Sequence, residues 1–183
     1  MEELQLLYTR PNRYKFIDTR DKIITSLLIH QALTSNEIKD LNLTNIDLDM
    51  GTIYIKASRK ISGRTLELDK SQIMLLDTYI NEIRPKMIRT NTNRLILSKL
   101  GKEISVCGIH AIFEPMKVLF PYKNLCPERI RMSVISYWLN DKKIPVEQVM
   151  DMSGQKWPSS VMMYKKINIE EQRELINRYH PLR

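Results

Sequence analysis

The side chains best suited to bind a charged partner are lysines and arginines that gather in two stretches. The 183-residue chain has 29 Lys/Arg and 21 Asp/Glu, a net charge of +8. Six basic residues and no acid lie between Arg84 and Lys102, and four lie between Lys56 and Arg64, again without an acid. Concentrated positive charge indicates a polyanionic partner, most simply nucleic acid. The alternative interpretation is a solvated surface that keeps the protein soluble.

Residues that could hold a metal or a cofactor show no pattern. Cys107 and Cys126 form no C-x-x-C pair and have no histidine at a ligand-like spacing, so we expect no zinc site and read both as reduced thiols. A glycine-rich phosphate loop is also missing, so we expect no cofactor. No apolar stretch approaches the ~20 residues of a membrane span, and the acidic start, Met1-Glu2-Glu3, is unlike a secretory signal. These features predict a cytoplasmic protein without membrane contact.

Hydrophobic periodicity predicts the elements that must position any site. Apolar residues at 23, 24, 27, 28 and 29 indicate a helix over residues 18–33, and Ser35 is a plausible N-cap for a second helix. Alternation predicts strands over residues 52–55 and 65–68, and 95–97 reads as a third strand.

The rest of the pattern is helical, beginning with a helix that Asp69 caps. The predicted helices cover residues 69–83, 105–119, 127–139, 145–152, 159–163 and 170–179. Helices around a small three-stranded antiparallel sheet make an α+β, mostly α fold. We expect residues 1–17 to be a short N-terminal segment or linker and residues 18–183 to form one domain.

This order of elements resembles the catalytic domain of tyrosine recombinases, the phage integrase family. The segments that carry the resemblance are Ala32–Ile38 for the family's G-L-R-x-S-E-L, Leu41–Gly51 for L-x-x-x-D-I-D-x-x-x-G, Lys60–Leu68 for K-x-R-x-x-P-L, Glu128–Ser133 for H-x-L-R-H-T, and Ser153–Gln155 for L-G-H. Tyr164 follows Gln155 by nine residues, which is the family's interval from that histidine to its nucleophile. The similarity covers about residues 18–180.

The resemblance implies roles for three residues in breaking and rejoining DNA. Tyr164 would be the nucleophile that forms a 3′-phosphotyrosyl link, and Arg131 would hold the phosphate with its planar fork. Lys60 would protonate the leaving 5′-oxygen. The loop is one residue longer than usual, so Arg59 could occupy the lysine's place instead.

Three positions depart from the family pattern. Thr34 stands where the family has its first arginine, Glu128 where it has the first histidine, and Gln155 where it has the second. Losing one transition-state donor typically costs ~100–1,000-fold in rate. These changes argue for reduced activity or none, so whether the chain is an enzyme stays open.

The resemblance also implies double-stranded DNA as the partner. The DNA-binding candidates beside the catalytic ones are Arg59, Arg64, Arg129, Lys156 and Lys165. Residues 170–179 are a candidate contact with a neighbouring subunit, which would give a homo-oligomer on DNA. The family's N-terminal DNA-clamping domain would precede residue 1, so we expect it to be absent from these 183 residues.

Three functions fit these patterns. The first is a site-specific recombinase or integrase of a mobile element, with impaired cleavage through Tyr164. The second is a catalytically inactive relative that keeps the fold and the basic face as a DNA-binding module. The third is an unrelated helical regulator whose basic face binds RNA or an acidic protein.

Overall fold

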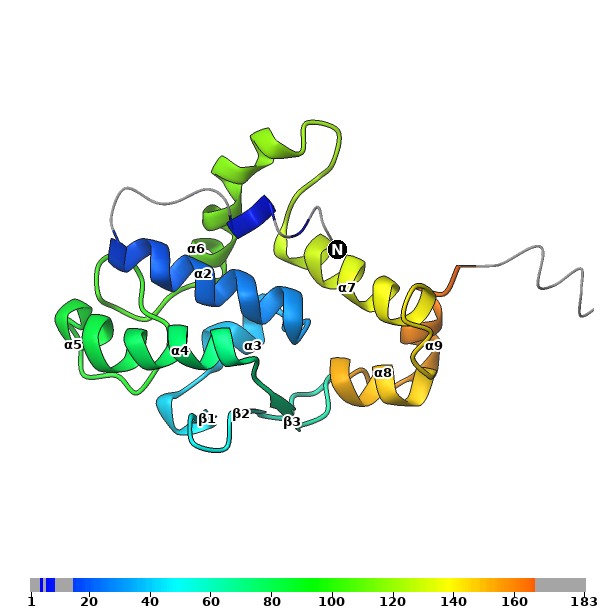
Figure 1. The fold of residues 1–183 in the computed structure, drawn as a ribbon, viewed down its shortest axis with the longest axis horizontal. Coiled ribbons are helices and arrows are strands. Elements are labelled where there is room, and N and C mark those ends of the chain that lie inside the picture. The colour runs from blue at the N-terminus through cyan, green and yellow to red at the C-terminus, as the bar shows by residue number, and fades with distance from the viewer. Residues whose placement is uncertain (1–3, 5, 9–14, 167–183) are drawn as a thin grey trace, which may run out of the picture.

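The computed structural model describes residues 4, 6–8 and 15–166, and Figure 1 shows helices packed above a small sheet. The predicted α+β, mostly α fold is confirmed, with a three-stranded antiparallel sheet. The helix expected over residues 170–179 lies outside the described residues, and of the N-terminal segment only residue 4, the short 3₁₀ helix Leu6–Tyr8 and residues 15–17 are described.

Helix α2, Lys15–His30, runs through the middle of the molecule (Figure 1) and forms the core that the apolar periodicity predicted. Leu27 and Leu28 are fully buried, and the helix contacts both α4 and α7. The helix begins and ends three residues earlier than expected. It stops at His30 because the chain turns sharply at Ala32, which has the left-handed φ of 48°.

Helix α3, Ser35–Asp40, begins one residue earlier than a Ser35 cap would require, so the cap prediction was wrong. The N-cap is Thr34, whose side chain accepts a hydrogen bond from the Glu37 N–H while the Glu37 side chain accepts one from the Thr34 N–H. This reciprocal capping box satisfies two backbone donors at the helix start. The threonine at the family's first arginine position therefore has a structural task of its own.

The sheet has the order β1-β2-β3, formed by Ile46–Asp47, Thr52–Ile55 and Arg64–Glu67. The two longer strands lie at or within one residue of their predicted positions. The expected third strand, Leu95–Leu97, was wrong: the segment is buried and lies outside the sheet, and only Leu97 forms an isolated bridge, with Glu103. Its apolar residues fill the core beside α2, and β1 supplies the third strand.

Helix α4, Lys70–Thr78, continues through the π-helical turn Tyr79–Ile83 into α5, Arg84–Met87. The single helix predicted over residues 69–83 is therefore three consecutive helical segments, and it ends four residues later than expected. Asp69 caps α4 as expected. The chain then forms α6, Val106–Phe113, which continues as a 3₁₀ helix to Leu119.

Helix α7, Pro127–Asn140, joins two hydrophobic clusters. Its Ile130 packs into the main cluster around α2, whereas Val134 and Trp138 belong to a second cluster with residues of α8, Val146–Ser153, and α9, Pro158–Met162. Arg131 lies between Ile130 and Val134, so α7 carries it to the junction of the two clusters. Figure 1 shows α8 and α9 beside the C-terminal end of α7.

The Asp69 cap gives the fold a defined response to acid. Hydrogen bonds from the Ser71 side chain and then from the Ser71 N–H hold the pKa of Asp69 below the ordinary value of 3.8. Because the pKa of Asp69 is lower in the folded than in the unfolded state, the ionised carboxylate contributes to the free energy of unfolding at pH values above its unfolded pKa. This contribution is lost as the pH falls through its folded pKa. We expect urea midpoints of the native chain and Asp69→Asn to converge as pH falls from 5 to 2. A constant difference over that range would contradict this role of the carboxylate.

Candidate functional site

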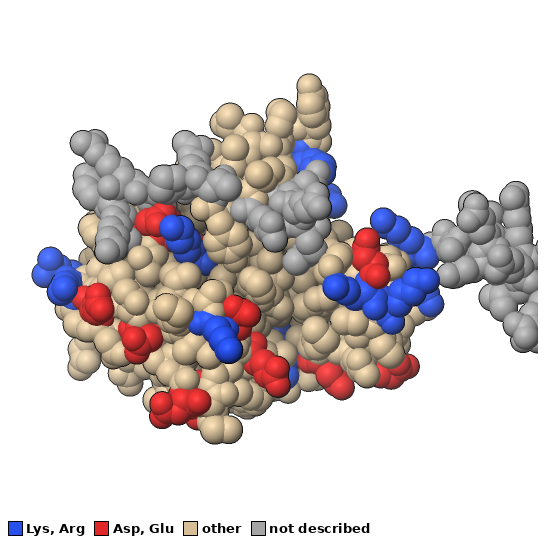
Figure 2. All heavy atoms as spheres, viewed as in Figure 1, with Lys and Arg blue, Asp and Glu red and all other residues tan. Residues whose placement is uncertain are grey.

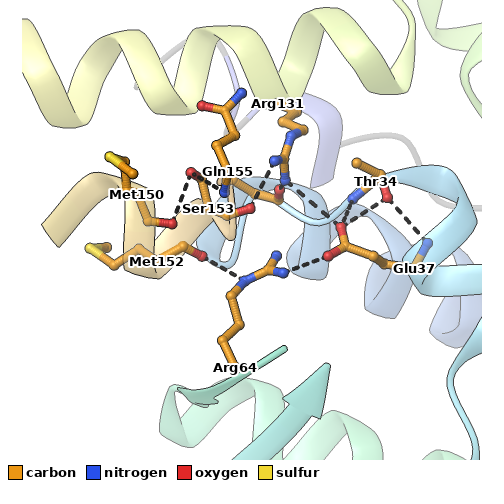
Figure 3. A network of polar contacts seen from close by, with 9 residues as sticks. Thr34, Glu37, Arg64, Arg131, Met150, Met152, Ser153 and Gln155 are labelled. Carbon is orange, nitrogen blue, oxygen red and sulfur yellow. Dashed lines mark hydrogen bonds and ion pairs between the residues drawn. The ribbon is translucent and has the colours of Figure 1, made fainter. Parts of the chain in front are cut away.

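Glu37 is the centre of a buried polar network that joins α3 to β3 and α7. Its Oε2 accepts hydrogen bonds from the Thr34 N–H at 2.7 Å and from the Thr34 hydroxyl at 2.8 Å. Its Oε1 accepts one from Arg64 Nη1 at 2.6 Å. Figure 3 shows the guanidinium groups of Arg64 and Arg131 approaching this carboxylate from opposite sides.

Arg131 reaches the network from α7 and is only 8% exposed. Its Nη1 donates to the Ala32 carbonyl and lies 3.8 Å from Glu37 Oε2. Its Nη2 donates to the Ser153 carbonyl at the end of α8, at 2.9 Å. Burial lowers the pKa of Arg131, and the nearby Arg64 adds to that effect, whereas Glu37 and Tyr164 raise it. The guanidinium is therefore held in a fixed orientation by three separate segments of the chain.

Arg64 lies inside the protein, although the sequence led us to expect it on a DNA-contacting surface. It is 8% exposed, and its Nε donates to the Met152 carbonyl at 2.9 Å. Its Nη2 is buried and has no hydrogen-bond partner among the described residues. Two buried guanidinium groups thus share the single carboxylate of Glu37, which leaves the network with an excess positive charge.

The loop that carries Lys60 connects β2 to β3 and lies beside this network. Lys60 and Arg59 are exposed, and they line one cleft of about 740 Å³ together with Thr34 and Glu37. Both basic residues line the cleft, so its geometry does not distinguish between these two candidates for the family's lysine position.

The same loop is fastened to the turn after α8. Lys156 Nζ donates to the carbonyls of Ser58 and Arg59 at 3.0 and 3.2 Å, and the Ser62 N–H donates to the Gly154 carbonyl at 2.8 Å. Lys156, a DNA-binding candidate, therefore also holds the Lys60 loop in place.

Tyr164 follows α9 and is half-buried against the second hydrophobic cluster. Asn140, the last residue of α7, fixes this segment: its amide Nδ2 donates to the Tyr164 carbonyl at 2.9 Å, and its Oδ1 accepts from the Lys166 N–H at 2.8 Å. The phenol of Tyr164 is among the groups that raise the pKa of Arg131, after Glu37. The helix that carries Arg131 thus also positions the candidate nucleophile.

The other two altered positions differ in their surroundings. The Glu128 carboxylate lies 3.1 Å from His110 Nε2 and is largely exposed. Gln155 is half-buried, and its Oε1 is buried without a hydrogen-bond partner in the part of the chain that the structure describes. A buried amide oxygen without a partner is costly, so the surroundings of Gln155 are incomplete without a further donor.

The remaining DNA-binding candidates, Arg129 and Lys165, are exposed. Figure 2 shows acidic and basic side chains mixed on one face, with basic groups gathered near the end of the molecule that α9 occupies.

No three His, Cys, Asp or Glu residues in the described ranges come together as a metal site. Among the same residues, no helix is long and apolar enough to cross a membrane.

Two residues that organise the site, Glu37 and Asn140, were not predicted from the sequence. The pattern T-x-x-E at residues 34–37 is the signature of a capping box and was the signal for Glu37. No such signal marks Asn140, because its role depends on the residues after α9 packing against the end of α7.

Comparisons with known proteins agree with this architecture. The model of the phage integrase family matches residues 1–171. The chain is 28% identical to the tyrosine recombinase XerD of Staphylococcus saprophyticus over 184 residues, which is 98% of this chain and 61% of that protein. Its fold is similar to the crystal structure of XerA recombinase, with a TM-score of 0.76 and 17% identity over 100% of this chain and 64% of that one. It is also similar to XerH site-specific recombinase bound to difH substrate in a pre-cleavage complex, with a TM-score of 0.80 and 15% identity over 98% of this chain and 52% of that one.

The family model and the similar folds identify the class of protein, a tyrosine-recombinase catalytic domain. The chain belongs to the phage integrase family, as the resemblance predicted. It spans 61% of the length of the curated XerD relative.

Gly154 is a position where the backbone and the site meet closely. It has φ +73°, and an added Cβ would lie within contact distance of Arg64 Nη1 and 2.7 Å from Ile61 Cγ2. We expect Gly154→Ala to destabilise the fold by at least ~1–2 kcal/mol, the usual cost of a left-handed alanine, because Arg64 must also move. Urea unfolding measures this.

Gly108→Ala is the matched control, since Gly108 is helical and its added Cβ would mainly meet the side chain of Ile104. A helical Gly→Ala change can gain up to ~1 kcal/mol. If the two alanine variants unfold at the same urea concentration, the close contact at Gly154 has no energetic importance.

Proposed function

We propose that this chain is the catalytic domain of a site-specific recombinase or integrase, which breaks and rejoins double-stranded DNA through Tyr164 at a reduced rate. The observation that carries the proposal is that helix α7 holds both Arg131 and the segment of Tyr164. The Arg131 guanidinium contacts three separate chain segments, and the Tyr164 carbonyl accepts a hydrogen bond from Asn140 of the same helix.

The chemistry follows from these positions. The Tyr164 oxygen attacks the phosphorus of a DNA phosphodiester, the bond to the 5′-oxygen breaks, and the products are a 3′-phosphotyrosyl link and a free 5′-hydroxyl. The phenol releases its proton to solvent, and Lys60, or Arg59 in its place, lines the cleft and donates a proton to the leaving 5′-oxygen. Arg131 would stabilise the charge that develops on the phosphate, which accelerates the reaction because the transition state is more negative than the ground state.

A catalytically inactive DNA-binding module is the second candidate, and Thr34 favours it. The threonine oxygen is committed to the capping box, so no cationic group stands at that place. Arg131 also donates hydrogen bonds to two protein carbonyls, which are the contacts of a structural arginine. Both candidates share duplex DNA as the partner, and self-association on DNA belongs to both as a further proposal.

Covalent adduct formation separates the two candidates. A duplex of the native site, once it is identified by selection from a random library, carries a nick near the cleavage position so that cleavage traps the enzyme. We expect a slowly forming adduct that Tyr164→Phe abolishes, whereas Tyr137→Phe, which removes a hydroxyl from the same cluster, leaves it intact. Salt-dependent DNA binding without a Tyr164-dependent adduct would establish the binding module.

Thr34→Arg tests the altered position that matters most. An arginine at residue 34 would face the cleft that Lys60 and Glu37 line, and it would add a cationic fork to it. The variant also loses the cap, which should cost about 0.5–2 kcal/mol of stability. We expect at least tenfold tighter DNA binding and a faster adduct, measured by fluorescence anisotropy and by the trapping assay.

Thr34→Ala is the control for the lost cap. It should be destabilised as much as Thr34→Arg but bind DNA no better than the native chain. Equal DNA affinity of the arginine and alanine variants would mean that residue 34 no longer faces the phosphate.

A further inference from the structure

Position 128, where similar enzymes carry a histidine, is paired here with a histidine from another helix. Glu128 Oε1 lies 3.1 Å from His110 Nε2, and the same nitrogen lies 3.4 Å from the Ser35 hydroxyl. The three residues come from α7, α6 and α3, and α6 packs against both other helices. A carboxylate, an imidazole and a hydroxyl therefore meet where the three helices join.

This junction is next to the site already described. Glu128 and Arg131 are three residues apart on α7, which places their Cβ atoms about 5–6 Å from each other on one side of the helix. Ser35 directly follows Thr34, whose backbone and hydroxyl bind Glu37. His110 thus stands at the edge of the network that holds Arg131.

The junction is open to a ligand, unlike the buried arginines. The side chain of His110 is 37% exposed and that of Glu128 is 58% exposed. Both contacts of the imidazole use Nε2, and within the described residues Nδ1 has no hydrogen-bond partner. A ring held by one nitrogen and open at the other can donate its second N–H to an anion when it is protonated.

We infer that His110 supplies the imidazole donor that position 128 lacks, and that it contacts a DNA backbone phosphate while Glu128 positions it. This inference rests on the proposed function, because its ligand is the DNA of that proposal. A protonated His110 cancels the charge of Glu128, so the carboxylate no longer simply repels the phosphate. Glu128 acts through His110 and is a positioning residue.

The test counts phosphate contacts. The probe is a fluorescent 30-base-pair duplex of arbitrary sequence, and anisotropy gives its affinity for the full chain over a salt series at pH 6. Each phosphate contact contributes about −0.9 to the log–log slope of affinity against salt. We expect His110→Gln to flatten the slope by about 0.9 and to weaken binding roughly 5- to 10-fold at low salt.

Two variants isolate the cause. His30→Gln is the matched control, because His30 is exposed at the end of α2, and it should leave the slope unchanged. His110→Lys keeps a cation at the same place and should restore most of the slope. Circular dichroism and urea midpoints of all variants show that the fold is retained.

Glu128→Gln tests the pairing. If Glu128 positions His110, the effect of His110→Gln on the slope should shrink in the Glu128→Gln background, because coupled residues are not additive. Additive effects would overturn the pairing. A His110→Gln slope equal to that of His30→Gln would overturn the inference and leave the proposed function intact. Binding of the native chain that does not respond to salt would overturn the proposed function, and the inference with it.

Discussion

The site depends on one carboxylate that two buried arginines share. Glu37 closes the capping box of α3 and lies between Arg64 from β3 and Arg131 from α7. Charges removed from water are costly unless they are paired and hydrogen-bonded, and leaving such a partner unpaired typically costs ~3–5 kcal/mol. The start of α3, the edge of the sheet and the long helix α7 are therefore held in one arrangement by this carboxylate, and the cleft beside them takes its shape from it.

Several close contacts extend this constraint to the rest of the site. Arg131 binds the Ala32 and Ser153 carbonyls, so the turn after α2 and the end of α8 share one guanidinium. The turn after α8 in turn holds the Lys60 loop through Lys156 and Gly154. Hydrogen bonds therefore connect segments that are distant in the sequence and fix their positions around the cleft. Fixed positions are what a catalytic geometry requires.

The sequence predicted the elements better than it predicted their partners. Helix α7 was placed within one residue because its apolar spacing and its Pro start are local signals. Leu95–Leu97 was mistaken for a strand because a short buried apolar run looks the same in either setting, and only the tertiary structure distinguishes them. Arg64 was expected to face DNA because sequence shows charge but not burial. His110 was not selected as a site residue because its partner, Glu128, lies on another helix. A contact between two helices does not show in the spacing of residues along the sequence.

The charges of the site explain why DNA binding and cleavage need not be lost together. Arg64 and Arg131 against Glu37 leave one excess positive charge even with Thr34 in place, and exposed Lys60 and Arg59 add to it at the cleft. Attraction to a polyanion depends on this summed charge and tolerates displacement of any one group. Transition-state stabilisation depends instead on donors within ~3 Å of particular oxygens. Threonine in place of arginine at position 34 lowers the summed charge of the site by one unit. It also removes the paired hydrogen-bond donors of a guanidinium group from the set that would contact the phosphate oxygens. If the chain acts as proposed, its affinity for DNA should therefore be less affected by the altered positions than its rate of cleavage.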